Sequence, residues 1–181
     1  MPVIELLQGR HDRKKFDCGK PPLNDFLQRQ ARQNADRNVG VTHVVVPNTG
    51  SEQILGYYTL VTRTIESSQV VDNKNLPRGE LGVILLGRLA VDKSAQGQGL
   101  GRRMLLRAIR QTEQASREVG VFGLVLDALD NEARGWYLHL EFGFKSLSDD
   151  PNHLILPISV IRQLELQRSP DTSSNSEQSP A

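Results

Sequence analysis

Three glycines at alternate positions, Gly97, Gly99 and Gly101, follow a mostly apolar run at 82–91 and open a helical pattern. Glycine lets backbone N–H groups approach a ligand closely because it has no Cβ atom. The first turn of a helix leaves its N–H groups unpaired and carries a partial positive charge. We therefore expect a strand, a tight turn and a helix start that together can hold a phosphate group.

The spacing of these glycines excludes two common phosphate-binding motifs. A dinucleotide fingerprint (G-x-G-x-x-G) that begins at Gly97 would need a third glycine where the sequence has Arg102. A P-loop needs a Gly-Lys pair followed by Ser or Thr, and the only Gly-Lys pair, at 19–20, is followed by proline. A glycine-rich turn between a strand and a helix, without a ligand, remains the alternative interpretation.

The composition is that of a globular protein. The 181 residues, 38% hydrophobic and 24% charged, are enough to bury one core. No apolar run is as long as a membrane span, and the stretch at 3–7 is too short for a signal peptide and contains an acid. The single cysteine, Cys18, excludes an internal disulfide, and the four histidines lack ligand-like spacing. We expect a cytoplasmic protein with no metal and no membrane partner.

The pattern of apolar residues predicts an α/β or α+β domain with one central sheet. Helices are expected at 23–35, from Leu100 beyond Ile109, from Asp130 or Asn131 to 140, and at 157–166. Strands are expected at 42–46, 54–65, 83–91, 121–126, 142–147 and 153–156. This domain comprises residues 1–166, and residues 167–181, which have almost nothing to bury, are predicted to form a disordered tail.

The net charge of +1 gives no general reason to expect nucleic-acid binding, but the basic residues are clustered. If the clusters met on one face, they could contact phosphates. The alternative is that they are the solvated faces of amphipathic helices. The candidates for nucleic-acid binding are Arg10, Arg13, Lys14, Arg102 and Arg103.

A series of short motifs occurs along the chain in a specific order. In chain order they are Phe16-Asp17-Cys18-Gly19, Leu23-Asn24-Asp25-Phe26-Leu27, Gly56-Tyr57-Tyr58-Thr59-Leu60, Leu86-Gly87-Arg88-Leu89-Ala90-Val91-Asp92, Gln96-x-x-Gly99-x-Gly101, Ala133-x-x-Trp136-Tyr137, Phe142-Gly143-Phe144, Asp149-Asp150-Pro151 and Leu154-x-Leu156-Pro157. Together they resemble the GNAT N-acetyltransferases, whose acetyl-coenzyme A loop reads Arg/Gln-x-x-Gly-x-Gly/Ala. The resemblance is greatest to the branch of bacterial toxins that acetylate aminoacyl-tRNA (TacT-like).

This resemblance implies a GNAT-like fold, with a central mixed, mostly antiparallel sheet that splays open and is flanked by helices. It implies acetyl-CoA as co-substrate. In the family, the main chain of the strand before the glycine loop pairs with the pantetheine arm, and the loop holds the pyrophosphate. The side chains at 89–91 are expected to belong to the core. The cofactor-binding residues implied in this way are Leu89, Ala90, Val91, Gln96, Gly97, Gln98, Gly99, Leu100, Gly101 and Arg102.

The resemblance also implies that Tyr137 is the catalytic acid that protonates the leaving thiolate. A tyrosine hydroxyl (pKa ~10) matches a thiol (pKa ~8.5) well enough for proton transfer. The family glycine usually lies four residues after this tyrosine, whereas Gly143 lies six after Tyr137. Counting back four residues gives His139, which is the alternative acid. A third interpretation makes Tyr137 a packing aromatic on a helix.

The function implied is the acetylation of the α-amine of aminoacyl-tRNA by a toxin. An ester lowers the pKa of the neighbouring α-amine, whereas a lysine amine (pKa ~10.4) would need a catalytic base. The sequence marks no such base. The branch implies a ribbon-helix-helix antitoxin as partner and a possible homodimer. The alternatives are a GNAT enzyme that acetylates a protein or small-molecule amine, and a non-catalytic acyl-CoA-binding module.

Overall fold

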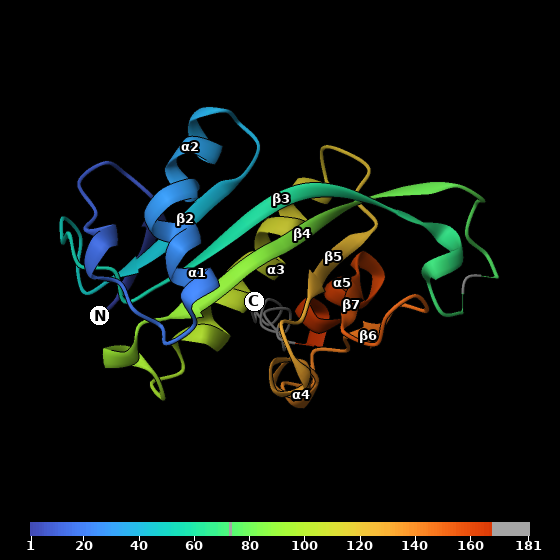
Figure 1. Cartoon of the computed structure of the whole chain (residues 1–181). Coiled ribbons are helices and arrows are strands. Elements are labelled where there is room, and N and C mark those ends of the chain that lie inside the picture. Colours follow the sequence, from blue (N-terminus) through green and yellow to red (C-terminus); the bar gives the residue numbers. More distant parts are fainter. Residues whose placement is uncertain (73, 168–181) are drawn as a thin grey trace, which may run out of the picture.

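A seven-stranded sheet organises the computed structural model, which describes residues 1–72 and 74–167 (Figure 1). The strand order is β1-β2-β3-β4-β5-β7-β6, and only β4 and β5 run parallel to each other. The strands are β1 (Val3–Leu6), β2 (Val41–Val46), β3 (Gly56–Glu66), β4 (Glu80–Val91), β5 (Gly123–Asp127), β6 (Lys145–Ser146) and β7 (His153–Pro157).

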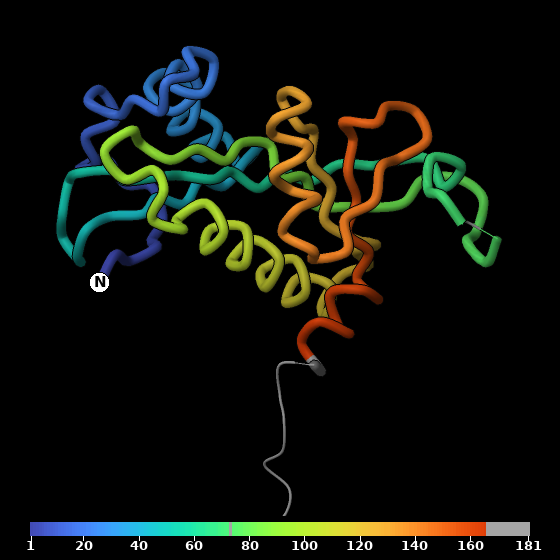
Figure 2. The backbone as a smooth tube through the Cα atoms, turned by 90° about the horizontal axis from the view of Figure 1, so that it is seen from below, coloured from blue at the N-terminus to red at the C-terminus, as the bar shows by residue number. Residues whose placement is uncertain are grey.

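Helices cover both faces of this sheet (Figure 2). On one face, α1 (Pro21–Asp25), the π-helical turn η2 (Phe26–Gln30) and α2 (Ala31–Asp36) follow one another. On the other face lie α3 (Leu100–Ser116) and α5 (Ile158–Gln167). The helix α4 (Asn131–His139) joins the core of α3 and α5 through Tyr137 and Ala133. Three short 3-10 turns are η1 (Arg13–Lys15), η3 (Ser67–Gln69) and η4 (Lys93–Ala95).

Most predicted elements are confirmed, with two corrections. The strand β1 was missed, because its four residues, which include the acid Glu5, give too little alternation to distinguish a strand from a loop. It forms by antiparallel pairing with β2, in which Val3 lies opposite Val46. The strand predicted at 142–147 is reduced to β6. Of the two predicted helix starts, Asp130 is the N-cap of α4, since its carboxylate accepts from the Ala133 N–H at 2.8 Å.

The predicted tail lies outside the described residues, except for Gln167 at the end of α5. Within the described part of the chain, every helix is too short or too polar to cross a membrane.

A β-bulge in the middle of β4 changes which side chains face which helices. Thr59 of β3 lies opposite Arg88, but Leu60 lies opposite Leu86, so Gly87 is the extra residue. Before the bulge, Leu86 faces the core under α3; after it, Leu89 faces the same core. Arg88 therefore points to the α1 face, where the next residue on that side, Ala90, is buried beside Phe26.

The sheet opens immediately after this bulge. The strand β5 pairs with β4 only at Ile84, Leu85 and Leu86. β4 continues to Val91, and in the described structure no strand pairs with residues 87–91 on the side away from β3. This unpaired edge is the predicted splay, and it leaves the main chain of β4 accessible.

A buried polar network fastens α3 to β2 and β3. The Tyr58 hydroxyl donates to the Gln111 side-chain oxygen at 2.6 Å, and Gln111 Nε2 lies 3.1 Å from His43 Nε2. Burial lowers the pKa of His43 to about 4, so a neutral imidazole accepts the amide hydrogen. The network fixes the direction of α3, and hence the position of its N-terminal turn.

Candidate active site

A groove of about 840 Å³ opens where β4 and β5 separate. Its walls come from the end of β4, the loop and first turn of α3, the start of α1, and α4. The sequence-predicted site residues that line it are Leu89, Ala90, Val91, Gln96, Gly97, Gly99, Leu100, Gly101, Arg102 and Tyr137. Of the predicted catalytic and cofactor-binding residues, Gln98 and His139 are not part of its lining, and of the predicted nucleic-acid-binding residues only Arg102 is.

One wall of the groove is the free main chain of β4. The Asp92 N–H donates to the Leu55 carbonyl at 2.9 Å, on the side of β3. Because backbone groups of successive strand residues point to alternate sides, those of Leu89 and Val91 point away from β3, into the groove. The Val91 carbonyl accepts from Gln96 Nε2 at 3.0 Å, while the side chains of Leu89 and Val91 pack against the α3 core. An extended ligand with amide groups can thus pair with Leu89 as another strand would.

The glycine loop continues this wall into a cradle of N–H groups. Gly97 and Gly99 both have φ of +76°, a left-handed conformation in which other residues are strained. No atom lies within 4 Å of a Cβ built at either position, so the space beside them is open. Gly99 is the N-cap of α3, and the Arg103 N–H donates to its carbonyl at 3.1 Å. The N–H groups of the turn before Arg103 remain for a ligand.

The third glycine has a packing role as well. A Cβ atom on Gly101 would lie 3.3 Å from the Trp136 ring and 3.8 Å from the Leu89 side chain. A Cβ atom here would be in tight contact with the exposed indole of α4, which would have to move by a few tenths of an ångström. Trp136 therefore borders the cradle, a contact that the glycine spacing alone did not predict.

The loop is held by a clasp from the N-terminal segment. Gln96 Nε2 donates to the Cys18 carbonyl at 3.1 Å as well as to that of Val91, so this side chain supports the loop. The Asp17 N–H donates to Asp92 Oδ2 at 2.9 Å, and Lys93 Nζ lies 2.7 Å from Asp17 Oδ2. The hydrogen bond from Lys93, with others from nearby N–H groups, lowers the pKa of Asp17 to about 2. We call these contacts of Asp17, Cys18, Asp92, Lys93 and Gln96 the loop clasp.

Tyr137 of α4 is a buried residue of the groove lining. Its ring packs edge-on against Trp136, at 4.9 Å between centroids, and against Phe144 at 6.1 Å. Among the described residues its hydroxyl has no hydrogen-bond partner. Burial raises the pKa of the phenol above its ordinary 10.0, so the hydroxyl keeps its proton at neutral pH.

His139, the alternative acid, is exposed near the end of α4. The helix ends at this residue, and Glu141 adopts a left-handed φ of +56° before Gly143. The two extra residues are thus absorbed in the turn after α4, and they do not displace Tyr137 from the groove.

The opposite wall is built from side chains on the α1 side. Lys20, just before α1, forms an ion pair of 2.9 Å with Asp130. Arg88 lies with its guanidinium carbon 4.8 Å from the centroid of the Phe26 ring. Burial raises the pKa of the Cys18 thiol, which disfavours the nucleophilic thiolate. This wall was not predicted from the sequence, because its residues come from distant parts of the chain.

With this geometry, the match to a known family can be placed on the structure. Residues 40–145, from β2 to the start of β6, match the family described as acetyltransferase (GNAT) domain. The chain belongs to the GNAT acetyltransferase family. The match includes the open edge of β4, the glycine cradle and Tyr137.

Several GNAT relatives are toxins. The chain is 34% identical over 155 residues to the tRNA-acetylating toxin of Mycobacterium tuberculosis, covering 84% of this chain and 90% of that protein. The structure of AtaT complexed with acetyl-methionyl-tRNAfMet has a TM-score of 0.84, at 31% identity over 93% of this chain and 100% of that chain. A tyrosine-to-phenylalanine mutant of the AtaT toxin, bound to the C-terminus of the antitoxin AtaR and acetyl-CoA, has a TM-score of 0.77, at 30% identity over 92% and 99% of the two chains. These likenesses confirm the predicted GNAT fold.

The predicted basic residues lie on both faces of this GNAT sheet. Arg102 and Arg103 are exposed at the start of α3, and the Arg102 guanidinium carbon lies 5.4 Å from the centroid of Phe142. Arg13 donates to the Gln28 carbonyl at 3.3 Å, so η1 and its Lys14 pack beside η2, on the face opposite α3 (Figure 2). Arg10 is paired with Glu5. The two groups therefore do not form one continuous stripe.

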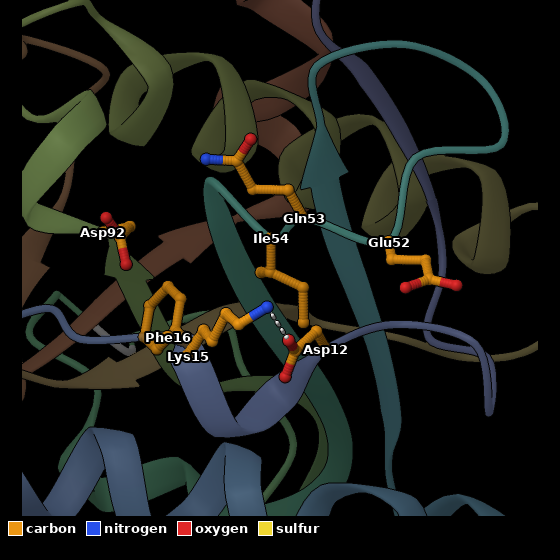
Figure 3. A pocket seen from close by; sticks show the side chains of 7 residues that line it. All are labelled: Asp12, Lys15, Phe16, Glu52, Gln53, Ile54 and Asp92. Atoms are coloured by element: carbon orange, nitrogen blue, oxygen red, sulfur yellow. Dashed lines mark ion pairs between the residues drawn. The ribbon is translucent and has the colours of Figure 1, made fainter.

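A second, smaller cavity of about 380 Å³ lies behind the loop clasp (Figure 3). Of its four charged groups, Lys15 pairs with Asp12 at 3.0 Å and Asp92 belongs to the clasp, while the fourth is Glu52. It contains none of the predicted site residues. The described residues also include no group of three or more His, Cys, Asp or Glu side chains placed to hold a metal ion. The groove is therefore the candidate active site.

Proposed function

We propose that this protein is an acetyl-CoA-dependent N-acetyltransferase that acetylates the α-amine of aminoacyl-tRNA, as the toxin of a toxin–antitoxin pair. The observation that carries the proposal is the groove itself, in which an open strand edge, an N–H cradle and a protonated tyrosine meet. The tRNA-acetylating relative from Mycobacterium tuberculosis supports the choice of acceptor.

The cofactor half of the groove fits acetyl-CoA. The main-chain groups of Leu89 would pair with the amides of the pantetheine arm, and the N–H groups from Gly97 to Arg102 would hold the pyrophosphate. The open space beside Gly97 and Gly99 allows phosphate oxygens to reach the backbone. When bound, acetyl-CoA supplies an activated acetyl group as a thioester.

Tyr137 is the proposed catalytic acid. Its hydroxyl donates a proton to the departing sulfur as the C–S bond breaks and the C–N bond to the amine forms. The phenolate then regains a proton from the newly acylated nitrogen, which restores the enzyme. A phenol is protonated at neutral pH even at its ordinary pKa of 10.0, and burial raises that pKa further, so the donor holds its proton before each turnover. His139, exposed outside the groove, is the less suitable donor.

The remaining acceleration comes from positioning. An α-amine next to an ester has a low enough pKa to be largely neutral near pH 7–8, so that no dedicated base is needed. Holding this amine against the thioester makes the reaction effectively intramolecular. The α1-side wall is the surface available for that task, because the β4 edge and the cradle serve the cofactor.

We propose that Arg10, Arg13, Lys14, Arg102 and Arg103 contact tRNA phosphates, so that binding weakens steeply with salt. Because these residues lie on two faces, the tRNA would wrap the molecule or contact two copies of a homodimer. An antitoxin is the expected partner, by analogy with the antitoxin AtaR that binds the AtaT toxin, and we propose the ribbon-helix-helix type that the resemblance to the toxin branch implies. We place the reaction in the cytoplasm, where charged tRNA is found, and without a metal.

The test is to incubate the purified protein with radiolabelled acetyl-CoA and a pool of charged tRNA. Transfer of label to RNA that is lost on mild deacylation, with an N-acetyl-amino acid identified by mass spectrometry, is the expected result. Label on proteins or small amines, with none on charged tRNA, would instead support a different GNAT acceptor. Tight binding of acetyl-CoA with no transfer to any amine would leave only a non-catalytic acyl-CoA-binding module.

A further inference from the structure

On the assumption that the proposed function holds, we infer that Arg88 binds a phosphate group of the tRNA acceptor end. Arg88 would thereby select an acceptor that carries a phosphodiester close to its reactive amine. The inference depends on the direction of the Arg88 side chain, on the contacts that restrain it and on its lack of an acidic partner.

The bulge at Gly87 gives Arg88 its direction. One extra residue turns Arg88 to the α1 face, whereas Leu89 faces the α3 core and offers its main chain to the cofactor. Arg88 nevertheless lines the same groove as Leu89 and Tyr137. Its charge therefore lies across the groove from the glycine cradle, on the side left for the acceptor.

The guanidinium of Arg88 is held in place before any ligand binds. It lies over the face of the Phe26 ring, 4.8 Å from the centroid, and its Nη1 donates to the Gly87 carbonyl at 2.7 Å. Stacking on an aromatic ring restrains the plane of the group and leaves other N–H donors free. Such a restrained planar fork suits the paired oxygens of a phosphate.

The charge of Arg88 also lacks an acidic partner. Among the described residues no carboxylate lies within ion-pair distance of it, although Lys20 in the same groove pairs with Asp130 at 2.9 Å. Arg63, three positions after Leu60 in β3, pairs with Asp127 at 2.8 Å. Arg102 also lines the groove without an ion pair, but it lies at the glycine cradle. On the α1 side, Arg88 is the unpaired cation among the described residues of the lining, and it suits an anionic ligand there.

The chemistry of the acceptor identifies that anion. In an aminoacyl ester the carboxyl group is esterified, so the amino acid itself carries no negative charge. The nearest anion is the phosphodiester on the 5′ side of the terminal adenosine. A protein N-terminus offers no anion at this place, and a free amino acid offers a carboxylate. Arg88 would therefore favour the RNA-linked amine over both.

The experiment compares two stable acceptors that differ by one phosphodiester. One is 3′-aminoacylamino-3′-deoxyadenosine, and the other is the same nucleoside extended by a 5′-linked cytidylyl group. For Arg88→Gln, kcat/KM for the phosphodiester acceptor is expected to fall ~10–100-fold, as for loss of a charge-assisted hydrogen bond. For the acceptor without phosphate it should change less than about twofold, as should the affinity for acetyl-CoA, which also shows that the variant is folded.

Two further variants sharpen the reading. Arg29→Gln removes an equal charge from an exposed side chain on the same face, outside the groove, and should leave both acceptors unaffected. Arg88→Lys keeps the charge without the planar fork and should give an intermediate loss. If Arg88→Gln does not fold, the Arg88→Lys comparison across the two acceptors decides the question.

If Arg88→Gln lowers kcat/KM equally for both acceptors, or for neither, the inference is wrong. The proposed function still stands in that case, provided that the wild type acetylates charged tRNA. With a free amino acid as a third acceptor, a loss confined to that acceptor would assign Arg88 to a carboxylate and also overturn the inference. If the wild type acetylated no aminoacyl-tRNA at all, the proposed function itself would fail. The wild-type reaction thus separates the two failures.

Discussion

The two walls of the groove recognise their ligands by different means. The β4 edge and the glycine cradle offer backbone groups, and the side chains of Leu89 and Val91 face the core. The α1-side wall offers side chains, with Arg88 and Lys20 as its charged groups. The cofactor wall should therefore tolerate most changes that keep its backbone conformation, whereas the acceptor wall should respond to single changes of charge. A change of acceptor specificity thus requires new side chains, whereas a change of cofactor specificity requires a different backbone conformation.

The largest effect is expected at the point where the two walls meet. Tyr137→Phe keeps the ring that packs on Trp136 and Phe144 but removes the proton donor. We expect kcat to fall by ~10²–10⁴, with little change in KM, in a steady-state assay of acetyl transfer. His139→Gln is the matched control and should retain activity. A greater loss of kcat for His139→Gln than for Tyr137→Phe would indicate that His139, at the end of α4, is the catalytic acid.

The next test concerns the backbone of the cofactor wall. Gly99→Ala and Gly50→Ala each place a side chain at positive φ, +76° and +89°, where nothing lies within 4 Å. Both should lower the free energy of unfolding by about 1–2 kcal/mol, because the left-handed conformation is strained for alanine. Only Gly99→Ala should weaken the binding of CoA, by roughly tenfold if the strain distorts the cradle. Calorimetric titration checks this, and equal CoA affinities for the two variants would refute a backbone cradle.

A smaller effect is expected from the side chains of the same loop. Gln96→Ala removes two hydrogen bonds of the loop clasp, worth about 1 kcal/mol each, and should weaken CoA binding by roughly threefold to tenfold. Gln98, by contrast, makes one long contact of 3.4 Å with the Ser94 carbonyl. Gln98→Ala should bind CoA as the wild type does. If Gln98→Ala bound CoA more weakly than Gln96→Ala, the side chain of Gln98 would contribute to the cradle.

The smallest effect concerns the pH dependence of the loop clasp. The pKa of Asp17 is lowered from 3.8 to about 2 in the folded protein, so its stabilisation is fully present above about pH 4. It is lost as the pH falls toward 2, where Asp17 becomes protonated in both states. Wild type should thus be slightly more heat-stable than Asp17→Asn at pH 5–8. The difference should vanish in acid, and melting curves that show it growing below pH 4 would contradict this sign.

The cofactor wall could be predicted from the sequence because it is built from residues that lie close together in the chain. The strand at 83–91, the turn at 96–99 and the helix from Leu100 were all read from neighbouring residues, and the structure confirms these elements. The placement of Tyr137 depended on resemblance as well as pattern. The groove brings Tyr137 to the cradle, but its catalytic role stays a prediction.

The acceptor wall and the loop clasp could not be predicted from the sequence. Lys20 and Asp130 are separated by 110 positions, and Asp17 and Lys93 by 76. No periodic pattern links residues at such distances, since only the tertiary fold brings them together. The bulge could not be predicted for another reason. Apolar residues lie on both sides of Gly87, so the sequence pattern does not show which face of the sheet each of them occupies.

That single extra residue also determines where this molecule can change its length. Removing Gly87 would restore regular pairing with β3 and leave Arg88 and Leu89 on their present faces, whereas regular pairing of Gly87 itself would send Arg88 under α3. Extending the connection between β3 and β4, at the far end of the hairpin, would shift no residue of the groove. Length changes in homologous enzymes with this groove should therefore occur at that distant turn or at position 87 itself, and should avoid the rest of β4.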